Sequence, residues 1–299
     1  MTTGPSTTTA EPTTSTAAPS GAVDVQVLAI NDFHGNVEAG TLSIDPTTGG
    51  SSGPVKEAAG GAAYLASHVA ALEAASPNSI FVAAGDLVGA SPLTSALFHD
   101  EPTVEALGLM GLDLSAAGNH EFDEGKAELR RLQEGGCHPV DRCQDGDEFA
   151  GSDYRYLTAN VTDTDTDEPL FPPYEIRDLG GARLAFVGIS LEATPTIVSP
   201  SGVAGLGFGD EADAVNALVP ELKAEGVDGI VVLIHDGGAQ TGPAPRGSTT
   251  AAASRVPSWG WPSASTLRWP RSSAATATPP STASSPARPS PRPRRTGGC

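Results

Sequence analysis

The sequence LDLSAAGNHE, residues 112–121, passes directly from an apolar segment into residues that can carry chemistry. An apolar segment of this length that is followed by glycine is typical of a buried β-strand. Gly118, Asn119, His120 and Glu121 would then lie where that strand ends. Amide oxygen and imidazole nitrogen are both ligands of divalent transition metals. The segment therefore predicts a functional site at one edge of a sheet.

Two earlier apolar segments end in a similar way. Residues 23–30 lead into Asp32 and His34, and residues 80–84 lead through a glycine into Asp86. Because alternate residues of a strand point to the same face, Asp32 and His34 could bind one cation together. Asp86 could bridge two cations of a hydrolytic site. Taken singly, each of these residues could equally be a helix cap or a surface residue.

A fourth candidate is His235, which follows the apolar segment 227–234. It would lie at the C-terminal edge of a sheet, where the sites of α/β proteins gather. The alternative is an exposed loop histidine. Asp123 lies three residues after His120 and could hold its imidazole ring in one tautomer. The competing interpretation of Asp123 is the N-cap of a following helix.

Residues 23–242 alternate strand and helix patterns, which predicts an α/β fold with a mixed sheet or two packed sheets and with helices outside. His68 is expected to pack on the apolar face of its helix, whereas His99 and His138 are expected in loops or at helix ends. Strands are expected at 23–30, 80–84, 112–117, 156–161, 174–179, 183–189 and 227–234, helices at 61–75, 122–133 and 210–225, and a loop at 36–60.

The composition limits the class of protein. The chain has 299 residues and a formal net charge of −19. Such an acidic chain is not expected to bind nucleic acid through a general basic surface. No apolar stretch reaches the roughly 18 residues of a membrane span.

Residues 1–22 are rich in Thr, Ser, Pro and Ala, which predicts a disordered linker of the kind that often follows an export signal or lipid anchor. A flexible tail on a cytosolic protein is the alternative.

Cys137 and Cys143 bracket a short loop, and the third cysteine is Cys299. The spacing is too wide for a CxxC redox motif and suits a small loop closed by a disulfide. Such a bond would indicate an oxidising compartment. Two unpaired thiols remain the alternative at this point.

The composition changes abruptly near residue 245. Residues 245–299 contain no Asp, Glu, Lys or Ile, but hold eight of the 17 basic residues, all of them arginine. No strand or helix periodicity is present, so this tail is expected to be disordered. An arginine-rich tail could bind an acidic surface. We prefer the hypothesis of a frameshift near residues 242–249, because GC-rich codons yield these amino acids in a wrong frame. The folded domain would then occupy residues 23–244.

Taken together, the motifs resemble the 5′-nucleotidase branch of the calcineurin-like metallophosphoesterases. Their order and approximate spacing match that family along most of the expected domain. The matching segments are LAINDFHG (28–35), AGDLVGASP (84–92), GNHEFD (118–123) and VLIHDGG (232–238), with LTAN (157–160) between the last two.

The resemblance implies a four-layer αββα sandwich that holds two divalent metal ions, Zn, Mn or similar. Asp32 and His34 would bind the first ion, and Asp86 would bridge both ions. Asn119 and His235 would bind the second ion. Mixed nitrogen and oxygen ligands do not select one metal among Zn, Mn, Fe, Co and Ni.

The resemblance also implies the roles of two further residues. A hydroxide that bridges the metals would attack phosphorus in line with the leaving group. His120, oriented by Asp123, would stabilise the transferring phosphoryl oxygens or protonate the leaving group.

The sequence departs from the family in one respect. The family carries a Gly-His-x-His motif after the strand that ends here in His235, with one ligand for each metal, and no histidine follows His235 in this chain. The C-terminal domain that grips the nucleoside has no counterpart either. An inactive truncated fragment is therefore the alternative to an active enzyme.

The expected activity is metal-dependent hydrolysis of phosphate esters, of the 5′-nucleotidase type. The substrate would be a small nucleotide or a related phosphate ester, and cyclic-nucleotide phosphodiesterase and UDP-sugar hydrolase are close variants. The expected location is extracellular, periplasmic or at the cell surface. A binder that acts through the tail at 245–299 is a third interpretation, against which the frameshift hypothesis argues. The sequence does not indicate an oligomeric state.

Overall fold

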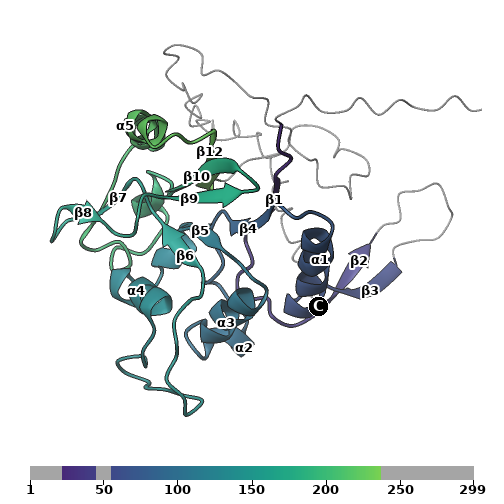
Figure 1. Ribbon diagram of the computed structural model, residues 1–299. Helices are drawn as coiled ribbons and strands as arrows, with labels where there is room; N and C mark the ends of the chain where they lie inside the picture. The colour runs from purple at the N-terminus through teal and green to yellow at the C-terminus, as the bar shows by residue number, and fades with distance from the viewer. Residues whose placement is uncertain (1–21, 45–54, 237–299) are drawn as a thin grey trace, which may run out of the picture. The chain divides into compact units, whose positions relative to one another are not determined.

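The computed structural model describes residues 22–44 and 55–236, all of which lie within one compact unit of the chain (Figure 1). The expected linker over residues 1–22 lies outside the described residues except for its last residue, and the expected tail over 245–299 lies wholly outside them. The described part combines helices with parallel and antiparallel strands, which confirms the predicted α/β class.

A four-stranded parallel sheet carries three of the predicted site segments. Its order is β1-β4-β5-β6. The strands are β1 (Gln26–Ile30), β4 (Ser79–Ala83), β5 (Leu114–Ala116) and β6 (Arg155–Leu157). Since the strands are parallel, their C-terminal ends share one edge of the sheet. The segments that follow β1, β4 and β5 are therefore brought together at that edge.

A second sheet, in the order β12-β10-β9, carries the fourth site segment. Strand β9 (Tyr174–Leu179) pairs antiparallel with β10 (Ala182–Ile189), which confirms the strands predicted at 174–179 and 183–189 and shows that they form a hairpin. Gly180 and Gly181 have φ of 68° and 92°. The turn needs this left-handed backbone, which glycine adopts without steric cost. Strand β12 (Gly229–Ile234) pairs parallel with β10 and ends next to His235.

Two small antiparallel sheets depart from the sequence expectations. Strands β2 (Gly40–Ile44) and β3 (Val55–Ala59) pair within residues 36–60, so the prediction of a loop there is wrong. The other sheet has the order β11-β7-β8. Its strands are β7 (Val161–Asp163), β8 (Glu168–Pro169) and β11 (Leu206–Phe208).

The single strand predicted over 156–161 is also wrong, because the chain leaves the parallel sheet after β6 and enters another sheet at β7. The side chain of Asn160 stabilises the segment that links β6 of one sheet to β7 of the other. Its side-chain amide donates to the carbonyls of Ser190 and Gly209 at 2.6 and 2.9 Å. Its side-chain oxygen accepts the Ser190 N–H at 2.9 Å. A buried amide that is fully paired in this way fixes three chain segments against one another.

Five α-helices and two short 3-10 helices complete the described fold. Their bounds are α1 (Ala62–Ala74), α2 (Leu93–Ala96), α3 (Glu101–Leu109), α4 (Lys126–Glu134), α5 (Glu211–Ala224), η1 (His120–Phe122) and η2 (Thr194–Thr196). The start of α5 matches the prediction, and the side chain of Asp210 accepts the N–H of Asp213 there.

Two expectations about helices are corrected. The helix predicted over 122–133 begins only at Lys126, because Gly125 has a φ of 90° and separates it from η1. His68 is exposed on α1 and does not pack in the core. The side of α1 that meets the core is formed by Val69 and the neighbouring Leu65.

Alternate side chains of the central strands belong to different hydrophobic clusters. In β4, Phe81 and Ala83 join the cluster that contains residues of α1, α3 and α4. Ile80 and Val82 instead join a cluster with residues of β10 and β12. Strand β10 likewise contributes Phe186 to that second cluster, while its other side contacts residues of α5. Burial on both faces explains why these strands read as continuous apolar runs.

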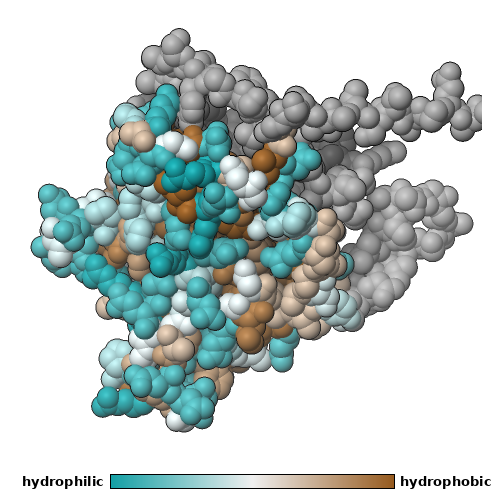
Figure 2. Space-filling view, viewed as in Figure 1, coloured by the Kyte–Doolittle hydropathy of each residue, from teal (hydrophilic) through white to brown (hydrophobic). Residues whose placement is uncertain are grey.

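The visible surface is mostly hydrophilic, with apolar residues in small groups (Figure 2). None of the helices in the described part of the chain has the length and apolar character that crossing a membrane requires.

Cys137 and Cys143 form a disulfide with a Cα–Cα distance of 4.7 Å, as predicted. The loop that it closes contains an isolated β-bridge between His138 and Arg142. The bond restricts the unfolded chain more than the folded one, and for a loop of this size the effect amounts to about 2 kcal/mol.

We expect Cys137→Ser/Cys143→Ser to lower the free energy of unfolding by about 2 kcal/mol, because the unfolded chain regains its freedom. Urea denaturation measures the change, and Cys299→Ser is the matched control with no expected effect. Thiol titration of unfolded protein from an oxidising compartment should find Cys299 alone reactive before reduction. Three reactive thiols in that sample would contradict the disulfide.

Candidate functional site

The predicted site residues lie where β1, β4, β5 and β12 end. The segment after β1 runs beside the segment after β4, because the His34 N–H donates to the Asp86 carbonyl at 3.1 Å and the Asp32 N–H donates to the Gly85 carbonyl at 3.2 Å. Asp32, His34 and Asp86 have φ of 52°, 44° and 54°. Left-handed backbone is uncommon for residues other than glycine and gathers at functional sites.

The left-handed backbone, and not a shared strand face, explains why the side chains of Asp32 and His34 lie close together. We expected them to share the face of a strand, but both lie beyond the end of β1. Their side chains converge because the loop is wound left-handed and bonded to the segment around Asp86. The His34 Nε2 is 3.5 Å from Asp32 Oδ1 and 3.7 Å from Asp86 Oδ2.

His235 reaches the same two carboxylates from the other sheet. Its Nε2 is 3.0 Å from Asp86 Oδ2 and 3.7 Å from Asp32 Oδ1. Asp32 thus lies nearly as close to His235, at 3.7 Å, as to His34, at 3.5 Å, whereas the resemblance pairs it with His34 alone. Asp86 is buried, while the Asp32 side chain is about half exposed.

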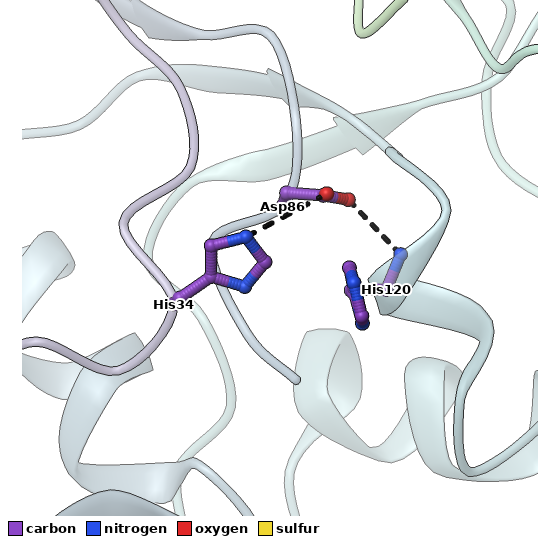
Figure 3. A group of neighbouring side chains, drawn as sticks. All are labelled: His34, Asp86 and His120. Carbon is purple, nitrogen blue, oxygen red and sulfur yellow. Dashed lines mark hydrogen bonds and ion pairs between the residues drawn. The ribbon is translucent and has the colours of Figure 1, made fainter. Parts of the chain in front are cut away.

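Asp86 also contacts the segment after β5 (Figure 3). Its Oδ1 accepts the backbone N–H of His120 at 2.9 Å, so its two oxygens serve different neighbours. The rings of His34 and His120 lie edge to face, with centroids 4.9 Å apart. Figure 3 shows Asp86 between the ring of His34 and the backbone of His120.

The ring of His34 is held in a tautomer that suits a metal ligand. Its Nδ1 lies 2.8 Å from the carbonyl oxygen of Gly89. A carbonyl can only accept, so Nδ1 carries a proton, and the lone pair of the neutral ring is then on Nε2, which faces Asp32 and Asp86. A backbone carbonyl that orients a histidine in this way is common behind metal ligands.

His120 and Asp123 form a pair beside these residues. The His120 Nδ1 is 2.7 Å from Asp123 Oδ2. Burial by itself lowers the pKa of His120, but the hydrogen bond to Asp123 and the surrounding carboxylates outweigh it and raise that pKa above its usual value. The alternative of a helix N-cap is wrong for Asp123, because Gly125 occupies that position of α4. Asn119 precedes His120 at the start of η1, where its side chain makes no capping hydrogen bond.

Glu121 is a residue that the sequence reasoning missed. Its buried carboxylate accepts three backbone N–H groups, those of Asp86 at 2.9 Å, Leu87 at 2.8 Å and Gly118 at 2.7 Å. Burial and the nearby Asp86 carboxylate raise the pKa of Glu121 to about 7, while the three N–H groups act in the opposite direction. Glu121 ties the loop after β4 to the loop after β5. Only its place in the GNHE motif hinted at this role.

Glycines allow these two loops to approach so closely. A Cβ on Gly118 would collide with the Asp86 carboxylate, and a Cβ on Gly85, whose φ is 116°, would collide with the backbone of Gly118. The glycines of the GD and GNHE motifs are therefore required by contact between loops.

Two groups of side chains that include Asp86 could each hold a cation. One is Asp32, Asp86 and His235, and the other is His34, Asp86 and His120, and in each group the ligand atoms lie within 4.8 Å of one another. Asp86 belongs to both groups. The mixture of carboxylate and imidazole, with one lone pair already oriented on His34, fits divalent transition metals.

We expect Glu121→Gln to lower the free energy of unfolding by about 1–3 kcal/mol, because its new NH₂ group would face backbone N–H donors that it cannot pair with. Urea denaturation of the metal-free protein measures the loss. Glu134→Gln, at the exposed end of α4, is the matched control. Equal stability of the two variants would contradict the role of Glu121.

Comparison with known proteins identifies the family to which the chain belongs. The chain is 36% identical to endonuclease YhcR of Bacillus subtilis over 242 residues, which cover 81% of this chain and 19% of that protein. It is 36% identical to the cell wall protein Lmo0130 of Listeria monocytogenes, over 77% of this chain and 30% of that protein. The chain thus spans less than a third of either relative.

Among solved structures, the chain is similar to a 5′-nucleotidase precursor from Thermus thermophilus, with a TM-score of 0.56 and 26% identity over 71% of this chain and 37% of that one. The sequence pattern of the calcineurin-like phosphoesterases matches residues 25–256, most of the chain. The family resemblance is therefore confirmed. This chain belongs to the calcineurin-like phosphoesterase family, in a domain related to the 5′-nucleotidases.

Proposed function

We propose that this chain hydrolyses phosphate esters at the site centred on Asp86, with two divalent cations such as Zn²⁺ or Mn²⁺. The observation that carries the proposal is the position of the Asp86 carboxylate, which belongs to both groups of possible ligands. A carboxylate shared by two cations is the feature that a dinuclear hydrolytic site needs.

The two geometric groups divide the ligands differently from the family resemblance, and we follow the resemblance. The proposed ligands are then Asp32 and His34 for one cation, Asn119 and His235 for the other, and Asp86 for both. His34 is supported by the hydrogen bond from its Nδ1 to Gly89, which leaves Nε2 free. His235 is supported by its distance of 3.0 Å from Asp86. Asn119 is supported only by its place in the GNHE motif, beside His120.

When bound, the two cations supply Lewis-acid chemistry and an activated water nucleophile. The ring of His120 lies beside that of His34, and His120 is the proposed catalytic acid. The hydrogen bond to Asp123 favours its protonated form. Asp123 is a positioning residue, because it acts through the His120 ring. Glu121 keeps the loops that carry Asp86 and His120 in register.

The four-layer αββα arrangement is part of this proposal. It is supported by the three hydrophobic clusters, of which one contains residues of β4 and of α1, α3 and α4, one contains residues of both main sheets, and one contains residues of β10 and α5. The layering would matter for function because His235 and Asp86 follow strands of different sheets and would face one substrate from both.

Nucleotides are the proposed substrates, by analogy with the related 5′-nucleotidase precursor. Similarity to a protein that is called an endonuclease makes polynucleotides the second candidate. The net charge of −19 argues against extended contact with a polyanion and favours a small phosphate ester. The disulfide and the similarity to a cell wall protein support a location outside the cytoplasm.

We expect hydrolysis of an aryl phosphate when Mn²⁺, Co²⁺ or Zn²⁺ is supplied. Asp86→Asn should lower kcat/KM at least about 100-fold, because it removes the shared charged ligand. His120→Ala should lower kcat by roughly 100-fold or more. His68→Ala, on the exposed side of α1, is the matched control.

Wild-type turnover in either site variant would refute the assignment of these residues. A wild-type chain that folds but neither binds these metals nor hydrolyses any phosphate ester would establish the alternative, an inactive fragment.

The pH dependence tests Asp123 separately. Because the Asp123 carboxylate raises the pKa of His120, Asp123→Asn should lower that pKa, and the acid form of His120 should then be lost at lower pH. The alkaline limb of the kcat/KM profile should move to lower pH. Asp178→Asn, near the end of β9, should leave the profile unchanged. An unmoved limb in Asp123→Asn would contradict the proposed role.

A further inference from the structure

A buried carboxylate that belongs to none of the sequence motifs lies behind the proposed site. Asp100 is 8% exposed and comes directly before α3. Its Oδ2 accepts the backbone N–H of Gly89 at 3.0 Å, and its Oδ1 accepts the hydroxyl of Ser95 at 2.6 Å. Among the described residues, the hydrogen-bond partners of this carboxylate are thus an N–H group and a hydroxyl, and not a cation. A buried charge without a cationic partner is costly, so its presence needs a reason.

The conformation of Asp100 is unusual for the residue before a helix. An N-cap residue normally has extended backbone, and an aspartate there accepts an N–H of the first helical turn. Asp100 instead has left-handed backbone, with φ of 62° and ψ of 11°, and its side chain makes no capping hydrogen bond. The preceding His99 is also left-handed, with φ of 50°. The chain between α2 and α3 therefore directs the carboxylate to Gly89 and not to the helix, and such backbone strain gathers at functional sites.

Gly89 lies between His34 and the pair formed by His120 and Asp123. Its carbonyl oxygen accepts the N–H of His34 Nδ1 at 2.8 Å. A Cβ on Gly89 would come within 2.8 Å of Asp123 Oδ2 and 2.9 Å of His120 Cβ. A displacement of Gly89 would therefore change the hydrogen bond that orients the His34 ring.

The hydroxyl of Ser95 anchors the Asp100 carboxylate. Ser95 and Thr103 are fully buried, and their hydroxyl oxygens lie 2.6 Å apart. A hydroxyl has one proton, so Ser95 donates to Asp100 and accepts from Thr103. Hydrogen bonds thus run without a break from α3 through Ser95, Asp100 and Gly89 to the ring of His34.

We propose that Asp100 is a positioning residue, which fixes Gly89 and thereby holds His34 with Nδ1 as the donor and Nε2 facing the metal site. This inference rests on the proposed function, in which His34 is a metal ligand. The effect is geometric. The N–H and the carbonyl of Gly89 belong to different peptide groups, so the charge of Asp100 does not pass to His34 through one amide.

An asparagine at position 100 should serve equally well. Its oxygen can accept the Gly89 N–H, and its NH₂ group can donate to the Ser95 hydroxyl, which then donates to Thr103. The competing interpretation is that Asp100 only stabilises the junction of α2 and α3.

The tautomer of His34 in the metal-free protein tests the proposal without a metal or a substrate. Multiple-bond nitrogen–proton NMR correlation at alkaline pH shows which ring nitrogen carries the proton. We expect Nδ1 to carry it in the wild type and in Asp100→Asn. Asp100→Gly should increase the share of the Nε2-protonated form, because Gly89 is no longer fixed. Glycine adopts left-handed backbone without strain, so this variant removes the carboxylate and keeps the turn.

Asp113→Ala is the matched control for the tautomer. Asp113 comes before β5, and its Oδ2 also accepts a backbone N–H, that of Phe81 at 3.1 Å. This variant should leave the His34 ring unchanged. The same tautomer in Asp100→Gly and the wild type would overturn the proposal. An Asp100→Asn protein that behaves like Asp100→Gly would overturn it too, because position alone would not explain the effect.

Zn²⁺ titration by isothermal calorimetry measures the consequence for the metal site. Asp100→Gly should weaken Zn²⁺ binding about tenfold, at the lower end of the effect of residues behind metal ligands, and Asp100→Asn should not. In a His34→Ala background, Asp100→Gly should have no further effect, because the positioning acts through His34. An equal loss in both backgrounds would show that Asp100 only supports the fold. A wild-type chain that binds no Zn²⁺ would refute the proposed function, while the tautomer would still decide the role of Asp100.

A second variant keeps the test decisive if circular dichroism shows that Asp100→Gly is unfolded. Ser95→Ala leaves the Asp100 carboxylate in place but removes the hydroxyl that anchors it. The His34 tautomer should shift in the direction expected for Asp100→Gly, and Zn²⁺ binding should weaken severalfold. Ser67→Ala, on the exposed side of α1, should change neither. An unchanged tautomer and affinity in a folded Ser95→Ala protein would contradict the anchoring of Asp100 and, with it, the proposal.

Discussion

The described site depends on the hydrogen bonds that the Glu121 carboxylate accepts from three backbone N–H groups. These groups belong to two loops that follow neighbouring strands, and no side chain of either loop could be placed accurately if the loops moved apart. Asp86 reinforces the link from the other direction, by accepting the His120 N–H. The Glu121 carboxylate is buried where it makes these bonds, and burial disfavours its charged form and raises its pKa. The glycines on both sides make the close approach possible.

Much of the fold could be predicted because hydrophobic periodicity is a local property of the sequence. The strands β4, β5, β10 and β12 were recognised from apolar runs that result from burial on both faces. The prediction failed where long-range contacts decide the structure. The break between β6 and β7 depends on Asn160 and its partners near Ser190 and Gly209, and no local pattern reveals those partners. The hairpin of β2 and β3 was hidden by a composition typical of loops.

The candidate site was likewise predictable in part, where sequence motifs decide it, and not where long-range contacts do. The motifs identified Asp32, His34, Asp86 and His235, and the structure brings their side chains together. The reason for the convergence of Asp32 and His34 was wrong, because the left-handed backbone of their loop cannot be read from residue types alone. Asp100 was not recognised, since it meets Gly89 only when the segment between α2 and α3 packs against the loop after β4. Resemblance to a family directs attention to shared motifs and away from the residues that support them.

The order of the strands along the chain has a consequence for biosynthesis. The parallel sheet is built entirely from residues 26–157, whereas the second main sheet is built from residues 174–234. A chain that emerges from the ribosome can therefore pair its first sheet before the second exists, and N-terminal units generally fold first. Asp32, Asp86 and Asn119 would be in place early, while His235 would arrive last. The centre at Asp86 would therefore be completed last, when β12 pairs with β10 and brings His235 beside Asp86.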